Sequence, residues 1–164
     1  MNRFIRSALV ALALSGIQIR PHSAAAGSPD PCSLLSAEEV AAVIGASALE
    51  ALPLSDRQCR YQPTWEISAG RWNFLTIEAA PQGANGKFAA AFVAASNMHA
   101  PPGFIDASSR PPVGDGSFFE GGPFPIAFYA RRGDAYVEID MRALTGNHSV
   151  MGPILAAKAL DRLK

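Results

Sequence analysis

The clearest pattern along the chain is an alternation of apolar and polar residues over residues 125–143. Gly133 and Asp134 separate two alternating runs, which predicts a two-residue hairpin turn. The register set by that turn places apolar pairs on one face: Ala130 with Val137, Phe128 with Ile139 and Ile126 with Met141. It places polar pairs on the other: Arg131 with Tyr136, Tyr129 with Glu138 and Ala127 with Asp140. We therefore expect a hairpin with one buried and one polar face.

Shorter patterns predict the remaining elements. Ser36 and Glu39 form a capping box at the start of a helix, and Pro153 suits only the first turn of a C-terminal helix. The predicted elements in chain order are helix 36–45, strands 57–62 and 71–80, helix 85–98, a strand around Phe118 and Phe119, the two hairpin strands and helix 151–164. This order, α-β-β-α-β-β-β-α, predicts an α+β fold with an antiparallel sheet and helices packed on one of its faces.

One long segment, residues 99–125, precedes the hairpin, and 11 of its 27 residues are Gly or Pro. A loop of this length inside a compact domain usually holds a hidden strand or carries function. Val113 and the Phe118–Phe119 pair flank a Gly114–Asp115–Gly116 turn, which favours a short buried strand. The rest of the segment is a candidate binding loop.

The N-terminal residues are typical of a secretory signal peptide. Arg3 and Arg6 precede an apolar run over residues 7–17, and small residues end at a cleavage site after Ala26. The run is too short to span a bilayer. We therefore expect residues 1–26 to be removed, leaving one domain over residues 27–164. That domain is predicted to be soluble, periplasmic or secreted, and without stable membrane insertion.

The predicted cleavage also changes the charge balance. The whole chain has 14 basic and 14 acidic residues, and residues 1–26 contain three of the arginines and none of the acids. Subtracting those three leaves 11 basic residues against 14 acidic ones. A nucleic-acid binder needs a basic surface to neutralise phosphates, so the sequence argues against that class of partner.

The chain has two cysteines, Cys32 and Cys59. An acylated lipoprotein cysteine directly follows the apolar run, whereas residues 28–31 precede Cys32 well beyond it. A cysteine nucleophile would need a histidine partner, and neither His99 nor His148 forms a known signature with a cysteine. Two cysteines in an oxidising compartment pair most simply with each other, which predicts a Cys32–Cys59 disulfide.

Catalytic motifs of hydrolases, metalloproteases and dithiol oxidoreductases are missing from the sequence. We therefore predict no catalytic residue, no cofactor and no metal site. His99 and His148 could form a metal site together with the acids of the hairpin, but the sequence shows no ligand spacing that supports such a site. The candidate binding surface consists of polar and aromatic side chains of the hairpin and nearby turns: Trp65, Asp115, Tyr129, Arg131, Tyr136, Glu138 and Asp140. The alternative interpretation of this face is a solvated ladder of compensated charges.

Several stretches together resemble a known family: DPCSLLSAEEVAAVIG, CRY, VGDGSFF, ARRGDAYVEIDM and the terminal Ala/Leu helix. They are similar to small exported bacterial proteins and lipoproteins, mainly actinobacterial, classed as a domain of unknown function. More distantly, they resemble extracellular sensor domains of bacterial serine/threonine kinases. The resemblance implies the same disulfide, an α+β fold and an envelope location. The chain departs from the family in lacking a lipobox, and the family supplies no catalytic residue.

These observations favour a non-enzymatic extracytoplasmic binding or sensor-like module for a small ligand or an envelope protein. Two alternatives remain open. The first is a small periplasmic hydrolase or lyase that uses Glu138 and Asp140. The second is an inhibitor of a secreted enzyme.

Overall fold

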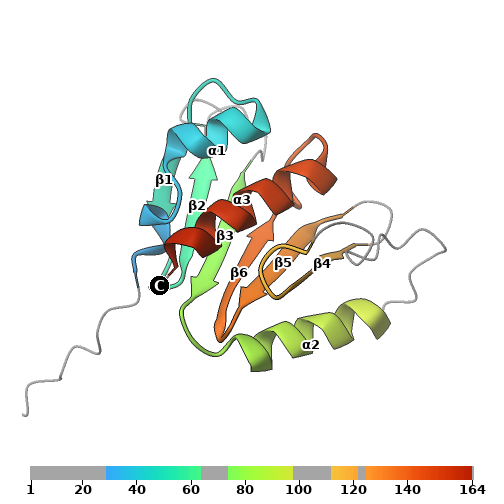
Figure 1. Cartoon of the computed structure of the whole chain (residues 1–164). Coiled ribbons are helices and arrows are strands. Elements are labelled where there is room, and N and C mark those ends of the chain that lie inside the picture. The colour runs from blue at the N-terminus through green and yellow to red at the C-terminus, as the bar shows by residue number, and fades with distance from the viewer. Residues whose placement is uncertain (1–28, 64–73, 98–111, 122–124, 164) are drawn as a thin grey trace, which may run out of the picture.

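The computed structural model describes residues 29–63, 74–97, 112–121 and 125–163 (Figure 1). Its elements in chain order are η1 (Pro31–Ser33), α1 (Ala37–Ile44), β1 (Glu50–Pro53), β2 (Gln58–Gln62), β3 (Leu75–Ala80), α2 (Ala84–Asn97), β4 (Gly116–Glu120), β5 (Ala127–Arg132), β6 (Ala135–Asp140) and α3 (His148–Arg162). The strands form one antiparallel sheet in the order β1-β2-β3-β6-β5-β4. The predicted α+β class is confirmed, and β1 is an additional strand that the sequence analysis did not expect.

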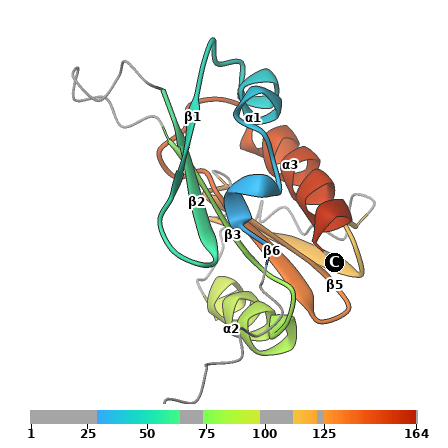
Figure 2. The ribbon, with the colours of Figure 1, turned by 90° about the vertical axis from the view of Figure 1, so that its left-hand side faces the viewer.

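The helices lie on both faces of the sheet. Figure 2 shows α1 and α3 on one side and α2 on the other. The prediction that all helices share one face is therefore wrong for α2. The physical reason is that β4 and β5 turn the rings of Phe118 and Tyr129 toward α2, where they pack with Phe88 and Ala91. The ring of Tyr129 supplies apolar surface even though its hydroxyl is polar.

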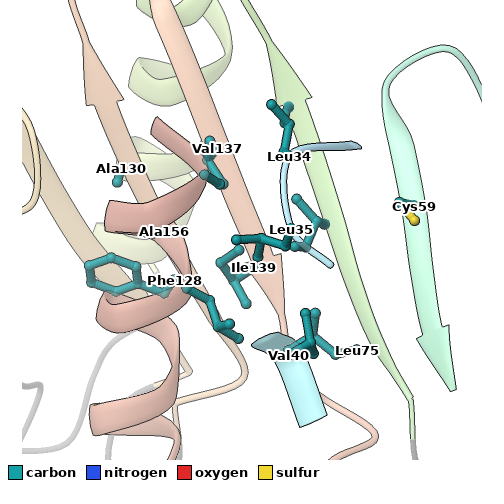
Figure 3. Close-up of a cluster of buried hydrophobic side chains, with 14 of the residues drawn as sticks. Leu34, Leu35, Val40, Cys59, Leu75, Phe128, Ala130, Val137, Ile139 and Ala156 are labelled. Carbon is teal, nitrogen blue, oxygen red and sulfur yellow. The ribbon is translucent and has the colours of Figure 1, made fainter. Parts of the chain in front are cut away.

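The main core lies between the sheet and the α1–α3 layer. Figure 3 shows side chains of the N-terminal segment and of the sheet strands gathered in one cluster. The buried side chains of α3 are Leu155, Ala156, Ala159 and Leu160, and Leu163 directly after the helix is buried as well. Gly152 allows α3 to approach β5 closely, because a Cβ atom at this position would fall 2.7 Å from Phe128 Cβ.

The hairpin of β5 and β6 has the predicted register, with Phe128 opposite Ile139 and Tyr129 opposite Glu138. Gly133 adopts a left-handed φ of 58° in the turn, as a tight hairpin connection requires. On the core face, Phe128 and Ile139 are almost completely buried. The apolar and polar sorting along the sequence therefore sets the strand pairing correctly.

The start of α3 differs from the prediction. The helix begins at His148, so Pro153 lies inside it and not in its first turn. The side chain of Asn147 makes no capping hydrogen bond. The imidazole of His148 instead contacts the carbonyl oxygens of Pro125 and Leu144 through its two nitrogens, the second at 3.0 Å. These contacts connect the first turn of α3 to the segments that precede β5 and follow β6.

The predicted disulfide is confirmed and joins η1 to β2. Cys59 is completely buried, and Tyr61 on the same strand donates a 2.8 Å hydrogen bond to the carbonyl oxygen of Leu35. The predicted capping box is also present, since Ser36 and Glu39 each accept from the other's backbone N–H. The N-terminal segment is therefore fixed to the sheet covalently and by hydrogen bonds.

The predicted signal peptide, residues 1–26, lies outside the described residues. Within the part of the chain that the structure describes, no helix has the length and apolar character needed to cross a membrane.

Candidate functional site

The sheet face opposite α3 carries polar side chains in two parallel rows across β2, β3 and β6. We call these residues the polar sheet face: Gln58, Arg60, Thr76, Glu78, Glu138 and Asp140. One row runs from Gln58 through Glu78 to Glu138, and the next from Arg60 through Thr76 to Asp140. All six side chains are partly exposed. Antiparallel register partners point to the same side of a sheet, so this surface is continuous over three strands.

The first row contains a compact charged cluster fastened by Lys87 of α2. The Lys87 ammonium contacts a carboxylate oxygen of Glu78 and lies 3.3 Å from Glu138 Oε2. Tyr136 donates a 2.5 Å hydrogen bond to Glu78 Oε1, and Gln58 donates a 2.8 Å bond to Glu78 Oε2. One lysine therefore neutralises part of the charge of two carboxylates that face each other across neighbouring strands.

The pKa values of the two carboxyl groups in this cluster are shifted in opposite directions. Burial raises the pKa of Glu138, and the attraction of Lys87 offsets only part of that effect. Burial also acts to raise the pKa of Glu78, but hydrogen bonds from Lys87, Tyr136 and Gln58 outweigh it and hold the pKa below its ordinary value. Glu78 is thus the better stabilised anion of the pair.

The second row begins with Arg60 and ends with Asp140. The Asp140 carboxylate accepts two fork-like hydrogen bonds from Arg142, Nε at 3.1 Å and Nη2 at 2.5 Å. The guanidinium of Arg60 lies 4.4 Å from the centroid of the Phe74 ring. Its Nε atom is buried and has no hydrogen-bond partner. Asp140 is therefore neutralised within the structure, whereas Arg60 is stacked but not neutralised.

Two of the predicted binding residues, Tyr129 and Tyr136, are buried, and a third, Arg131, is partly exposed. Tyr129 is 8% exposed and Tyr136 is 3% exposed, because α2 covers this part of the face. The Tyr129 ring stacks on Phe118 at 4.8 Å, and its hydroxyl donates to Glu120 at 2.9 Å. Arg131 donates to Asn85 Oδ1 of α2 at 2.7 Å. The prediction that Tyr129 and Tyr136 belong to an accessible surface is therefore wrong, because both pack against α2; Arg131 also contacts α2 but stays partly exposed.

The remaining predicted residues separate into three groups. Glu138 and Asp140 do lie on the polar sheet face, with side chains 16% and 20% exposed. Asp115 is exposed at the sheet edge, where its carboxylate accepts a 2.5 Å hydrogen bond from the Gly133 amide. Trp65 lies outside the described residues, as does His99. Of the six predicted residues that the structure describes, Glu138 and Asp140 therefore lie together on the polar sheet face.

Comparison of the chain with protein-family models, with curated proteins and with solved structures finds no match. The resemblance carried by the sequence stretches quoted above stays a prediction.

The sequence analysis missed Arg60, Thr76, Glu78 and Lys87. The first three sit at alternate positions of strands that were predicted, so the period-two pattern already placed them opposite the core. Lys87 is the single charged residue of the 14-residue helix α2. The Lys87 side chain is 37% exposed, and no pattern in the sequence of α2 indicates that it contacts Glu78 and Glu138.

Two shallow hollows lie elsewhere on the described surface. One, of about 370 Å³, is bounded by Arg142 and the start of α3, and the other, of about 360 Å³, follows the end of α1. Both nitrogens of His148, in the first hollow, already face carbonyl oxygens. In the described ranges, no three His, Cys, Asp or Glu side chains are grouped to hold a metal ion.

Proposed function

We propose that this chain is an exported, non-enzymatic binding module that takes a small ligand or an envelope partner on its polar sheet face. The signal-like N-terminus and the disulfide support an extracytoplasmic, periplasmic or secreted location. The binding role is supported by a rigid scaffold with a half-buried polar surface over β2, β3 and β6.

One observation favours binding over catalysis. Glu138 and Asp140, the carboxylates that acid–base chemistry would use, are already paired with Lys87 and Arg142. Arg60, in the same row as Asp140, has no carboxylate partner among the described residues. The polar sheet face therefore has a hydrogen-bond donor, Arg60, without an acceptor among the described residues, whereas the carboxylates of Glu138 and Asp140 are already paired.

The test uses a bulky substitution on this face. Thr76 lies in the middle of the second row, so Thr76→Trp should cover both of its neighbours. Thr145→Trp, at an exposed position in the connection to α3, is the matched control. Wild-type protein is mixed with the low-mass fraction of an envelope extract, and bound molecules are detected by ligand-observed NMR. A protein-partner arm uses capture from the same extract.

We expect wild type and Thr145→Trp to bind the same molecules and Thr76→Trp to lose them, with melting temperatures showing that all three proteins are folded. Equal binding by Thr76→Trp and Thr145→Trp would show that the ligand does not bind to the polar sheet face. An inhibitor of a secreted enzyme would appear in the capture arm, as an enzyme whose activity falls when the protein binds.

A hydrolase or lyase is the second candidate, and a single observation favours it. The pKa values of Glu78 and Glu138 lie on opposite sides of their ordinary value, as in pairs that divide acid and base roles. A hydrolase panel compares wild type with Glu78→Gln, which removes one member of this pair, and with the double variant Glu138→Gln, Asp140→Asn. Turnover by wild type that either variant loses would establish catalysis, and turnover by none of the three proteins supports the binding role.

A further inference from the structure

The Lys and Arg side chains of the described residues have polar side-chain partners, with one exception. Of the eight Lys and Arg residues in the described ranges, six lie within ion-pair distance of a carboxylate: Arg57, Lys87, Arg132, Arg142, Lys158 and Arg162. Arg131 donates to the side-chain oxygen of Asn85. Arg60 alone among these eight has neither an ion pair nor a side-chain hydrogen bond.

The acids nearest to Arg60 in the sheet register are already engaged. Glu50 accepts a 3.0 Å hydrogen bond from Gln62, and Glu78 is held by Gln58, Tyr136 and Lys87. Asp140, at the far end of the Arg60 row, is bound by Arg142. Because each of these carboxylates has its own donor, the positive charge of Arg60 is left without a counter-charge in the described structure.

The guanidinium of Arg60 is nevertheless held in a defined orientation. It lies 4.4 Å from the centroid of the Phe74 ring, which occupies one of its flat sides. All five N–H donors of a guanidinium lie in its plane, so stacking leaves them free to meet an acceptor at the edge. Since Nε is shielded from solvent, the terminal Nη groups are the donors that an incoming ligand meets.

On this basis, and resting on the binding role proposed above, we infer that Arg60 anchors an oxyanion, a carboxylate or phosphate group of a small ligand. Two terminal N–H groups in one plane match the two oxygens of such a group, and charge-assisted hydrogen bonds of this kind are roughly twice as strong as those between neutral groups. Partial burial of Arg60 strengthens the attraction, because fewer water molecules screen it.

The neighbours of Arg60 suit the same ligand. Thr76 lies next to it in the row and offers a hydroxyl that has no partner among the described residues. Asp140, one strand further, is neutralised by Arg142 and therefore repels an anion less than a free carboxylate would. An oxyanion bound between Arg60 and Thr76 would receive charged and neutral hydrogen bonds from two adjacent strands.

The experiment titrates the oxidised protein, purified without reductant, with inorganic phosphate and, separately, with acetate, at constant ionic strength maintained with sodium chloride. The readout is the set of backbone amide and arginine Nε–H signals in NMR spectra. Arg60→Met removes the donors, and Arg60→Lys keeps the charge without the planar fork. Arg57→Met is the control, because Arg57 is exposed in the β1–β2 turn and its removal changes the net charge equally.

We expect saturable shifts of the Arg60 Nε–H signal and the Thr76 amide with at least one of the two anions. Arg60→Met should weaken binding by at least about tenfold and Arg60→Lys by several-fold, while Arg57→Met stays within roughly twofold of wild type. Stronger binding of phosphate or of acetate identifies which oxyanion the site prefers. Shifts that do not saturate, or that Arg57→Met reduces as much as Arg60→Met, would overturn the inference.

Failure of this inference is separable from failure of the binding role. If neither anion binds but Thr76→Trp still removes molecules captured from the envelope extract, the polar sheet face binds a ligand and Arg60 is not its anion anchor. If neither anion binds and Thr76→Trp changes nothing, both proposals are wrong.

Discussion

Gly114 lies so close to the backbone carbonyl of Arg131 that a Cβ atom on Gly114 would fall 2.1 Å from the carbonyl oxygen. Next to this contact, the Asp115 amide donates to the same carbonyl at 2.7 Å, and the Asp115 carboxylate accepts from the Gly133 amide at 2.5 Å. The Gly114–Asp115–Gly116 turn therefore fastens the edge strand β4 to the end of the β5–β6 hairpin. Its role in the described structure is architectural.

Replacing Gly114 tests this contact. Gly114→Ala introduces both a steric clash and a left-handed φ of 70°, whereas Gly45→Ala introduces a left-handed φ of 73° with open space around the new methyl group. We expect Gly45→Ala to lower the free energy of unfolding by about 1 kcal/mol and Gly114→Ala to lower it by about 3 kcal/mol or more. Denaturant unfolding measures both values, and equal losses would show that the carbonyl contact is unimportant.

The disulfide should account for a large part of the stability. Cys32 and Cys59 enclose a loop with a sequence separation of 27 residues, and bridges of this size typically contribute about 2–5 kcal/mol. The double variant Cys32→Ser, Cys59→Ser is expected to unfold at a clearly lower temperature than the oxidised protein. Protein purified without reductant should show no free thiol, and two titratable thiols would contradict the bridge.

Glu39 gives a prediction for acid pH. Its hydrogen bond from Arg162, 2.6 Å from Nη1, and its backbone bond at Ser36 lower its pKa from 4.5 to about 2. Because the pKa falls on folding, this carboxylate stabilises the folded state above about pH 4.5, and the stabilisation disappears as the pH falls toward 2. Glu39→Gln should flatten the pH dependence of unfolding in that range. Glu50→Gln, whose partner is the neutral Gln62, is the control.

Phe128 and Tyr129 are sequence neighbours that point to opposite faces of the sheet, and both are buried. Phe128→Ala should cost about 3–5 kcal/mol of unfolding free energy because it opens the main core. Tyr129→Ala should cost about 2 kcal/mol or more, since it removes the ring that stacks on Phe118 beneath α2. If thermal unfolding of Tyr129→Ala matches wild type, α2 does not cover this face in solution.

The intact mass of the protein tests the predicted export and signal cleavage. If the signal is cleaved after Ala26, the intact mass of the protein released by osmotic shock corresponds to a chain that starts at Gly27. A mass that includes a diacylglycerol group, or partition of the protein into detergent, would show a lipid anchor instead.

The features that sequence reasoning predicted correctly depend on local rules. The hairpin register follows from a two-residue turn and strict alternation, and the start of α1 follows from Ser36 and Glu39. The strand β1 was missed because Glu50–Pro53 is short, ends in proline and has no clear alternation. Its pairing with β2 depends on contacts that only the folded chain provides.

The candidate site was harder to predict because it depends on strand order. Arg60, Thr76 and Asp140 form one row only because β3 lies between β2 and β6. Likewise, the Lys87 contact with Glu78 and Glu138 requires α2 to cross to the face opposite α3. No local pattern encodes that choice of face, since the rings that attract α2 come from β4 and β5.

The burial of Cys59 bears on when the disulfide forms relative to the folding of the C-terminal half of the chain. Both cysteines precede β3, whereas the strand that completes the sheet, β6, begins at Ala135. The two thiols can therefore meet while the C-terminal half of the chain is still unpaired. Once β6 and α3 have closed over the core, Cys59 has no exposed surface through which an oxidant or a reductant could reach it. We therefore expect the disulfide to form early in folding, and in the finished domain the partly buried Cys32 is the half of the bridge that a reductant would reach first.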